Sequence, residues 1–171
     1  QTNYLSETIN DFRNFFKLDR EKENVFLKEL IEDASKITLK SLSINNIDFE
    51  IDSKATSSIP LFKREMQQVI INLIRNAKEA ILEQDKSEKK IKIVTNEDEK
   101  NAYIKICDNG GGVDPNIMDK IFEPYFTTKD ELVGTGLGLY MSKMIIEKHM
   151  KGSIEVVNTD DGNCFTIIIP K

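Results

Sequence analysis

The chain of 171 residues is 39% hydrophobic and 31% charged, a composition typical of one globular domain rather than of a disordered, fibrous or membrane-embedded protein. Its 24 basic and 29 acidic residues give a net charge of −5, which argues against a protein that wraps nucleic acid. A single histidine excludes a metal site built from several histidines.

The chain opens with two amphipathic helical patterns. Apolar residues recur at helical spacing from Leu5 to Phe16, and so short a helix needs a partner to cover its apolar stripe. The charged stretch 19–24 interrupts this pattern and is interpreted as a boundary. A second amphipathic helix is predicted from Leu27 through Ile37.

Strand and helix patterns alternate through the rest of the chain. Apolar residues on both sides of Asn45-Asn46 predict a hairpin, and the longest helix is predicted from Arg64 to about Gln84. The other expected elements are strands at 89–95 and 102–107, a short helix at 115–121, a helix at 136–150, and strands at 153–158 and 163–169 joined by a turn. This order predicts an α+β domain, with one sheet and helices on one of its faces.

Cysteine usage and hydropathy indicate a cytosolic protein. Cys107 and Cys164 are far apart in the sequence and belong to no CxxC motif, so we expect two reduced, partly buried thiols. No stretch approaches the ~20 apolar residues of a membrane span, and residues 1–20 have no signal-peptide pattern. We therefore expect no membrane contact by this segment.

Two asparagines on the long predicted helix are candidate metal ligands. Asn72 and Asn76 lie one turn apart on the edge of the apolar stripe. An amide carbonyl is a hard oxygen ligand that suits Mg²⁺ bound to phosphates. A pair of solvated helix asparagines is the alternative.

Asp108 begins a glycine-rich segment, DNGGG, at the end of a predicted strand. A carboxylate in this position can accept a hydrogen bond from an exocyclic amine such as that of adenine. The glycines allow the backbone to approach a ligand closely. A tight turn capped by the aspartate is the alternative.

A second glycine-rich segment, GTGLGL at residues 134–139, opens a predicted helix. Backbone N–H groups and the helix dipole there can bind a phosphate without a basic patch. The segment lacks the Gly-Lys-Ser/Thr of a P-loop, so by itself it is a weak signal. Residues 122–133 before it combine aromatic residues with Pro124 and no core pattern, which fits either a hinged lid or an ordinary surface loop.

Taken together, these four segments resemble the GHKL ATP-binding superfamily, and within it the catalytic domain of sensor histidine kinases. The matching motifs are NLIRNA from Asn72, DNGGG from Asp108, FEPYFTTK from Phe122, GTGLGL from Gly134 and the closing strand GNCFTIIIP. The resemblance covers about residues 25–171. It implies a two-layer α/β sandwich of the Bergerat type, whose mixed, mostly antiparallel sheet carries helices on one face and an ATP lid.

The resemblance also implies roles for individual residues. Asn76 would coordinate Mg²⁺ with Asn72 supporting it as the second catalytic residue, and Asp108 would bind the adenine amino group of ATP. The pocket and the phosphate-binding segments would be formed by Gly110, Gly112, Thr128, Lys129, Gly134, Thr135, Gly136, Leu137 and Gly138. Phosphoryl transfer mainly requires positioning and charge neutralisation, which such groups supply.

Three positions depart from the family's pattern. ATP-hydrolysing relatives carry a glutamate as general base where this chain has Asn72, which favours transfer to a histidine over hydrolysis. Glu79 stands where many members have a lysine that reaches a phosphate, so Lys129 and Arg75 are the candidate replacements. Asn163 stands where a threonine is usual near the adenine, which leaves that contact open.

The phosphoacceptor histidine of the family is expected outside this sequence. His149 ends a predicted helix and does not match the acceptor box, so it is interpreted as a cation near a helix C-terminus. Residues 1–22 resemble the end of the dimerising helical hairpin, and residues 23–171 resemble the ATP-binding domain. The expected partners are the kinase's own dimerisation and phosphoacceptor domain, a second subunit and a response regulator, in the cytosolic part of a sensor that can be membrane-anchored.

The predicted function is therefore that of an ATP-binding histidine kinase domain, which transfers the γ-phosphoryl group of Mg-ATP to a histidine upstream of Gln1. One alternative is a GHKL-type serine kinase or ATPase, although both would favour a glutamate at position 72. The other is a degenerate, non-catalytic nucleotide-binding module, which the departures at Glu79 and Asn163 suggest.

Overall fold

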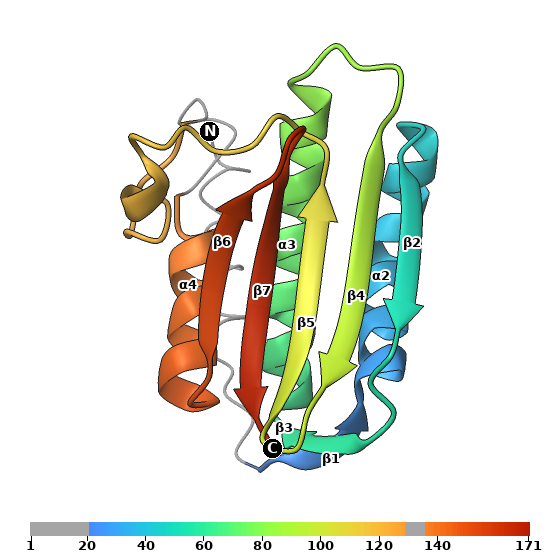
Figure 1. Ribbon diagram of the computed structural model, residues 1–171, viewed down its shortest axis with the longest axis vertical. Helices are drawn as coiled ribbons and strands as arrows, with labels where there is room; N and C mark the ends of the chain where they lie inside the picture. Colours follow the sequence, from blue (N-terminus) through green and yellow to red (C-terminus); the bar gives the residue numbers. More distant parts are fainter. Residues whose placement is uncertain (1–20, 129–135) are drawn as a thin grey trace, which may run out of the picture.

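A mixed sheet forms one layer of the molecule, and helices behind it form the other (Figure 1). The structure is a computed structural model that describes residues 21–128 and 136–171, so the helical pattern from Leu5 to Phe16 lies outside the described residues. The order of the five strands is β2-β4-β5-β7-β6. They span Asp48–Ser53 (β2), Lys90–Glu97 (β4), Asn101–Asp108 (β5), Ser153–Asn158 (β6) and Asn163–Pro170 (β7). Only β2 and β4 pair in parallel among these strands, which confirms the predicted mixed, mostly antiparallel sheet.

The helices cover one face of this sheet, as predicted. They are α2 (Leu27–Ile44), α3 (Lys63–Leu82) and α4 (Gly138–Met144), and α4 continues into a π-helical turn at Ile145–His149. The short helix predicted at 115–121 is a single 3₁₀ turn at Met118–Lys120. A small antiparallel sheet of β1 (Glu23–Phe26) and β3 (Ser58–Leu61) closes the lower end of the molecule (Figure 1).

The hairpin predicted around Asn45-Asn46 is wrong. Leu42 and Ile44 belong to the end of α2, and β2 pairs in parallel with β4 instead. Leu42 is 1% exposed because it continues the buried stripe of the helix. A short apolar run fits the end of a buried helix as well as a strand, and the two cannot be separated by periodicity alone.

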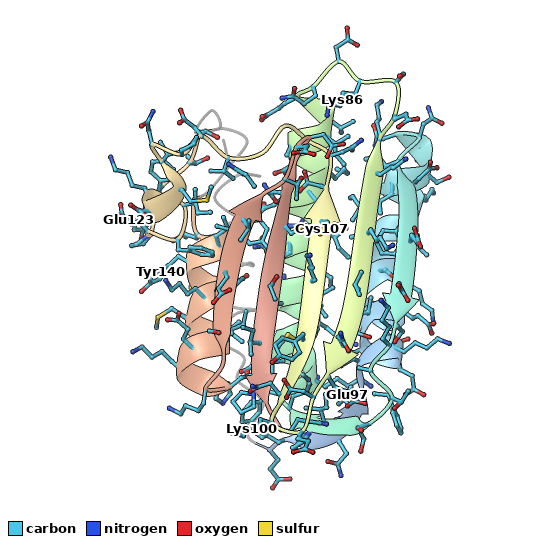
Figure 2. All side chains as sticks on the ribbon, viewed as in Figure 1. Lys86, Glu97, Lys100, Cys107, Glu123 and Tyr140 are labelled. Carbon is cyan, nitrogen blue, oxygen red and sulfur yellow. A yellow bond between two sulfur atoms is a disulfide. The ribbon has the colours of Figure 1, made fainter. Side chains whose placement is uncertain are left out.

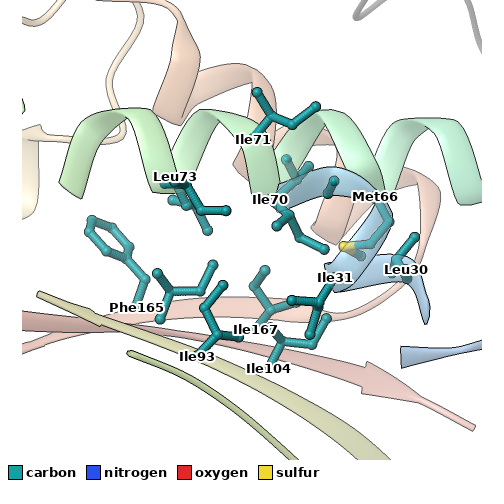
Figure 3. Close-up of a cluster of buried hydrophobic side chains, with 14 of the residues drawn as sticks. Leu30, Ile31, Met66, Ile70, Ile71, Leu73, Ile93, Ile104, Phe165 and Ile167 are labelled. Carbon is teal, nitrogen blue, oxygen red and sulfur yellow. The ribbon is translucent and has the colours of Figure 1, made fainter. Parts of the chain in front are cut away.

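Aliphatic side chains fill the space between the helices and the sheet (Figure 3). The stripe predicted on the long helix is buried, and Met66, Ile70 and Leu73 lie above strand residues such as Ile104 and Ile167. This packing fixes α3 across the sheet. The helices in the described part of the chain are all too short or too polar to cross a bilayer.

The two cysteines form a disulfide, so the prediction of two reduced thiols is wrong. Cys107 on β5 and Cys164 on β7 stand directly opposite each other in the antiparallel ladder, with 4.1 Å between their Cα atoms. They are 57 residues apart in the chain. The register of two strands brings their side chains to one face, and a single sequence does not reveal that register.

Candidate functional site

The segments singled out in the sequence meet α3 at two places, the loop after β5 near the end of this helix and the start of α4 near its middle. The backbone of the DNGGG loop lies against α3, since a Cβ on Gly110 would be 2.8 Å from the carbonyl carbon of Ala80. The first residue of α4 lies against α3 as well, since a Cβ on Gly138 would be 2.4 Å from Oδ1 of Asn72. These two glycines therefore allow the backbone to come so close to α3 that any side chain at either position would clash.

Asp108 ends β5 with its side chain buried on the helix-covered face of the sheet, where it is 8% exposed. The backbone N–H of Gly110 donates to Oδ1 of Asp108 at 2.8 Å. Loss of hydration on burial raises the pKa of Asp108 to about 6; the Gly110 hydrogen bond and Lys86 oppose this rise, and Asp161 adds to it. The site thus holds a carboxylate that is costly to keep charged without a ligand.

Asn163 stands opposite Asp108 in the β5–β7 ladder, so both side chains lie on the same face of the sheet. Asn163 is 5% exposed, and its Oδ1 accepts no hydrogen bond from any residue in the described part of the chain. A buried carbonyl without a donor costs stability. The pair therefore presents two acceptors, a carboxylate and an amide oxygen, side by side in a buried position.

Hydrogen bonds with neighbouring segments hold the DNGGG loop in place. The Asn109 side chain accepts from the Lys90 N–H and donates to the Glu88 carbonyl, both at 2.9 Å. Lys86, in the loop between α3 and β4 (Figure 2), donates to the carbonyl oxygens of Asn109 at 2.7 Å and Asp161 at 3.2 Å. Sequence reasoning missed Lys86, because a lysine in a charged stretch carries no distinctive pattern, and it gave no role to Asn109 although this residue belongs to the DNGGG motif.

The two helix asparagines have different surroundings. Asn72 is 9% exposed, and its Nδ2 donates to Oγ of Ser142 on α4 at 3.3 Å. This bond connects α3 with α4, so the alternative of two solvated asparagines is wrong for Asn72. Asn76 is half-buried one turn further along α3, and Arg75 beside it is exposed.

The described part of the predicted lid is anchored by aromatic side chains. The Phe122 ring packs edge-on against Phe165 with 6.2 Å between ring centroids, and Phe126 also packs on the core. At the other end of the lid, Gly136 lies against the backbone of Tyr125, where a Cβ would come within 2.5 Å. Both ends of the segment are thus held close together.

The phosphate-binding residues expected from the sequence fall partly on the lid. Lys129, Gly134 and Thr135 lie outside the described residues. Thr128 is exposed and Leu137 is buried, directly before α4. The third glycine of the DNGGG loop, Gly112, lies beside Asn158, whose side chain accepts from the Val113 N–H at 2.9 Å.

His149 ends the helical segment as predicted, but its contacts go beyond a helix terminus. Its Nδ1 pairs with the carboxylate of Glu65, which is buried near the start of α3. Its ring stacks on Phe62 with 3.7 Å between the centroids. The residues that hold His149 come from a segment far away in the sequence, so spacing could not reveal them.

Comparisons with known proteins give a consistent result. The family described as histidine kinase-, DNA gyrase B-, and HSP90-like ATPase matches residues 63–171. The signal transduction histidine-protein kinase AtoS of Escherichia coli (strain K12) is 36% identical over 152 residues, which cover 86% of this chain and 24% of AtoS. The chain spans between 12% and 31% of the length of the curated relatives compared with it.

Solved structures of similar fold also include histidine kinases. The catalytic domain of histidine kinase ThkA superposes with a TM-score of 0.79 at 32% identity, covering 88% of this chain and 98% of that domain. ThkA in complex with the response regulator protein TrrA gives a TM-score of 0.78 at 27% identity, covering 99% of this chain and 49% of ThkA.

Proposed function

Because the chain belongs to the family of histidine kinase-, DNA gyrase B- and HSP90-like ATPases, as the catalytic, ATP-binding domain of a two-component sensor histidine kinase, we propose that it binds Mg-ATP between β5, α3 and α4. It then donates the γ-phosphoryl group to a histidine outside this sequence. The observation that carries the proposal is the buried pair of acceptors, Asp108 and Asn163.

These two residues fit the amino group of adenine. That group has two N–H donors, and Asp108 and Asn163 offer one acceptor each from neighbouring strands. In this arrangement Oδ1 of Asn163 gains the donor that the described residues do not supply. Asn163 would thus bind the base in place of the threonine that is usual in the family, so its presence supports adenine binding.

The phosphate side of the site is assigned to the start of α4 and the lid. The backbone at Gly138 approaches α3 at Asn72, and the N–H groups of Gly136, Leu137 and Gly138 would meet a phosphate held near Asn76, one turn further along the helix. Asn76 would hold Mg²⁺ through its amide oxygen, and the ion would neutralise phosphate charge when bound. Thr128, Lys129, Gly134 and Thr135 would complete the binding segment.

Position 72 favours transfer over hydrolysis. The neutral amide of Asn72 is engaged with Ser142 and cannot take a proton from water. ATP would therefore persist until a histidine reaches it. The acceptor would be supplied by the dimerisation domain of the kinase, and residues 1–22 would be the end of that domain. Residues 23–171 would be the ATP-binding domain. Both would lie in the cytosolic part of a homodimeric sensor that passes the phosphoryl group to a response regulator.

Calorimetry with Mg-ATP tests the proposal. We expect the wild-type domain to bind, Asn163→Ala to weaken binding about tenfold through the loss of one hydrogen bond in a buried site, and Asn76→Ala to remove the Mg²⁺ dependence of binding. Lys92→Ala, on the open face of the sheet, serves as the control and should bind like wild type. Equal affinity in all three variants would contradict the assigned site.

Adding the dimerisation and phosphoacceptor domain of the parent kinase in trans tests the transfer. We expect acid-labile phosphate on that domain and none on His149. Tight Mg-ATP binding without any transfer would favour the non-catalytic nucleotide-binding module. Rapid ATP hydrolysis would favour an ATPase.

A further inference from the structure

The Cys107–Cys164 disulfide lies on the face of the sheet that the helices leave open (Figure 2). In the ladder it belongs to a row that runs from Lys92 through Cys107 and Cys164 to Val157. Lys92 is exposed and Val157 is 62% exposed. Among the described residues no helix covers this row, so small molecules in solution can reach it.

The next row of the ladder contains the proposed adenine contacts. Asp108 follows Cys107 on β5, Asn163 precedes Cys164 on β7, and these two residues pair with each other. The turn before β7 closes over the same point, since a Cβ on Gly162 would come within 1.8 Å of the carbonyl oxygen of Asp108. The disulfide therefore joins the two strands one step away from the groups proposed to bind the base.

From this juxtaposition, and resting on the proposed function, we propose that Cys107 and Cys164 are a site of reversible oxidation by small-molecule disulfides, and that the oxidised form binds Mg-ATP more tightly. The covalent link holds β5 and β7 together beside Asp108 and Asn163. A pair of acceptors that is already in place loses less freedom when adenine binds. The reduced form retains the hydrogen bonds of the ladder but not the link.

The surroundings of Cys107 suit thiol chemistry. Lys92 stands opposite Cys107 in the ladder and Lys105 is two residues before it, so two exposed ammonium groups lie on the same face as the thiol. Nearby positive charge favours the thiolate, which is the reactive form. The Glu50 carboxylate, 3.7 Å from the Lys92 ammonium, offsets part of this effect. Cys107 is half-buried and Cys164 is 6% exposed, so exchange begins at Cys107.

A small disulfide, RSSR, is the oxidant in this exchange, and it accounts for all atoms and electrons. The Cys107 thiolate attacks one sulfur, the bond between the two sulfurs of RSSR breaks, and the first RSH leaves after taking a proton. The Cys164 thiolate then attacks Sγ of Cys107 in the mixed disulfide and releases the second RSH. The two protein thiols lose two protons and two electrons, and RSSR becomes two RSH. Reduction runs through the same steps in reverse.

Thiol titration tests the reversibility. The domain is equilibrated with mixtures of reduced and oxidised glutathione and then alkylated, and intact mass counts the free thiols. We expect a reversible change from two alkylated cysteines to none, with no mixed disulfide accumulating at the midpoint. A disulfide that stays closed in excess reduced glutathione, or thiols that stay open in excess oxidised glutathione, would overturn the proposal.

Calorimetry on the two forms tests the coupling. We expect Mg-ATP to bind the oxidised form about fivefold more tightly, at the lower end of typical couplings between sites. By linkage, saturating Mg-ATP should shift the thiol–disulfide equilibrium constant toward the disulfide by the same factor. This second measurement reads thiols rather than nucleotide, so it checks the coupling independently.

Two variants control for the buffer and for folding. Cys107→Ser, and the double variant Cys107→Val with Cys164→Val, should bind Mg-ATP equally in reducing and oxidising buffers. If both forms of the wild type bind equally, the coupling is wrong and the proposed function stands. If neither form binds Mg-ATP, the proposed function fails and the coupling fails with it.

Discussion

At the scale of single residues, the balance between stability and binding is clearest at Asp108. Burial raises its pKa to about 6 from an ordinary value of 3.8. A group with a raised pKa contributes stability when protonated, and this contribution is lost as the pH rises through the folded-state value. At neutral pH the domain therefore carries a charged, buried carboxylate that lowers its stability in the absence of a ligand.

The variant Asp108→Asn should separate these two effects. Without nucleotide we expect it to raise the free energy of unfolding by about 2–3 kcal/mol at pH 7.5 and much less at pH 4, because the cost of the buried charge disappears. Denaturant unfolding at the two pH values measures this. A variant less stable than wild type at pH 7.5 would contradict the expectation.

The same variant should bind Mg-ATP about 10- to 100-fold more weakly, since it loses the charged acceptor proposed for the adenine amine. Wild-type affinity should fall as the pH drops through about 6, where Asp108 takes up a proton. The variant should lack that part of the pH dependence. Comparing the two proteins in the same buffers cancels the titration of the nucleotide's own phosphates.

At the scale of elements, the contact between α3 and α4 shapes the proposed phosphate side of the site. Gly138 begins α4 where a Cβ would come within 2.4 Å of Oδ1 of Asn72. Ser142, one turn further along α4, is fully buried and accepts from Nδ2 of the same asparagine. The start of α4 is thus positioned by one side chain of α3, and small changes there should move the backbone that is proposed to bind phosphate.

Gly138→Ala should therefore destabilise the domain and weaken Mg-ATP binding. We expect a loss of about 1–3 kcal/mol in unfolding free energy from overpacking. In an Asn72→Ala background the added methyl group has space, so the loss should be smaller. A double-mutant cycle of denaturant unfolding measures this coupling. Strict additivity of the two changes would show that the contact does not restrict the helix.

At the scale of the whole molecule, the disulfide links the strands on both sides of the long segment that carries the predicted lid and α4. The 57-residue separation of the two cysteines closes a large loop in the unfolded chain. Restricting that loop disfavours the unfolded state. We expect reduction to lower the unfolding free energy by about 2–4 kcal/mol. Thermal or denaturant unfolding with and without reductant measures this, and the double valine variant should not respond to reductant.

The sequence predicted much of the architecture because much of it is local. The long helix, the strands around Asp108 and the last hairpin follow from apolar periodicity and turn residues over a few positions. The end of α2 resembles a strand in the sequence because Leu42 and Ile44 fit the spacing of both a helix and a strand. The candidate site residues were found as four short segments, and each segment had a structural alternative.

The sequence by itself determined the class of fold, the family resemblance and the chemistry available at the site, since residue types and short spacings carry that information. The tertiary structure alone decided which residues meet. Strand register placed Asn163 beside Asp108 and joined Cys107 to Cys164, and helix packing set Gly138 against Asn72. Register and packing depend on contacts between residues far apart in the chain, whose energies no local pattern contains.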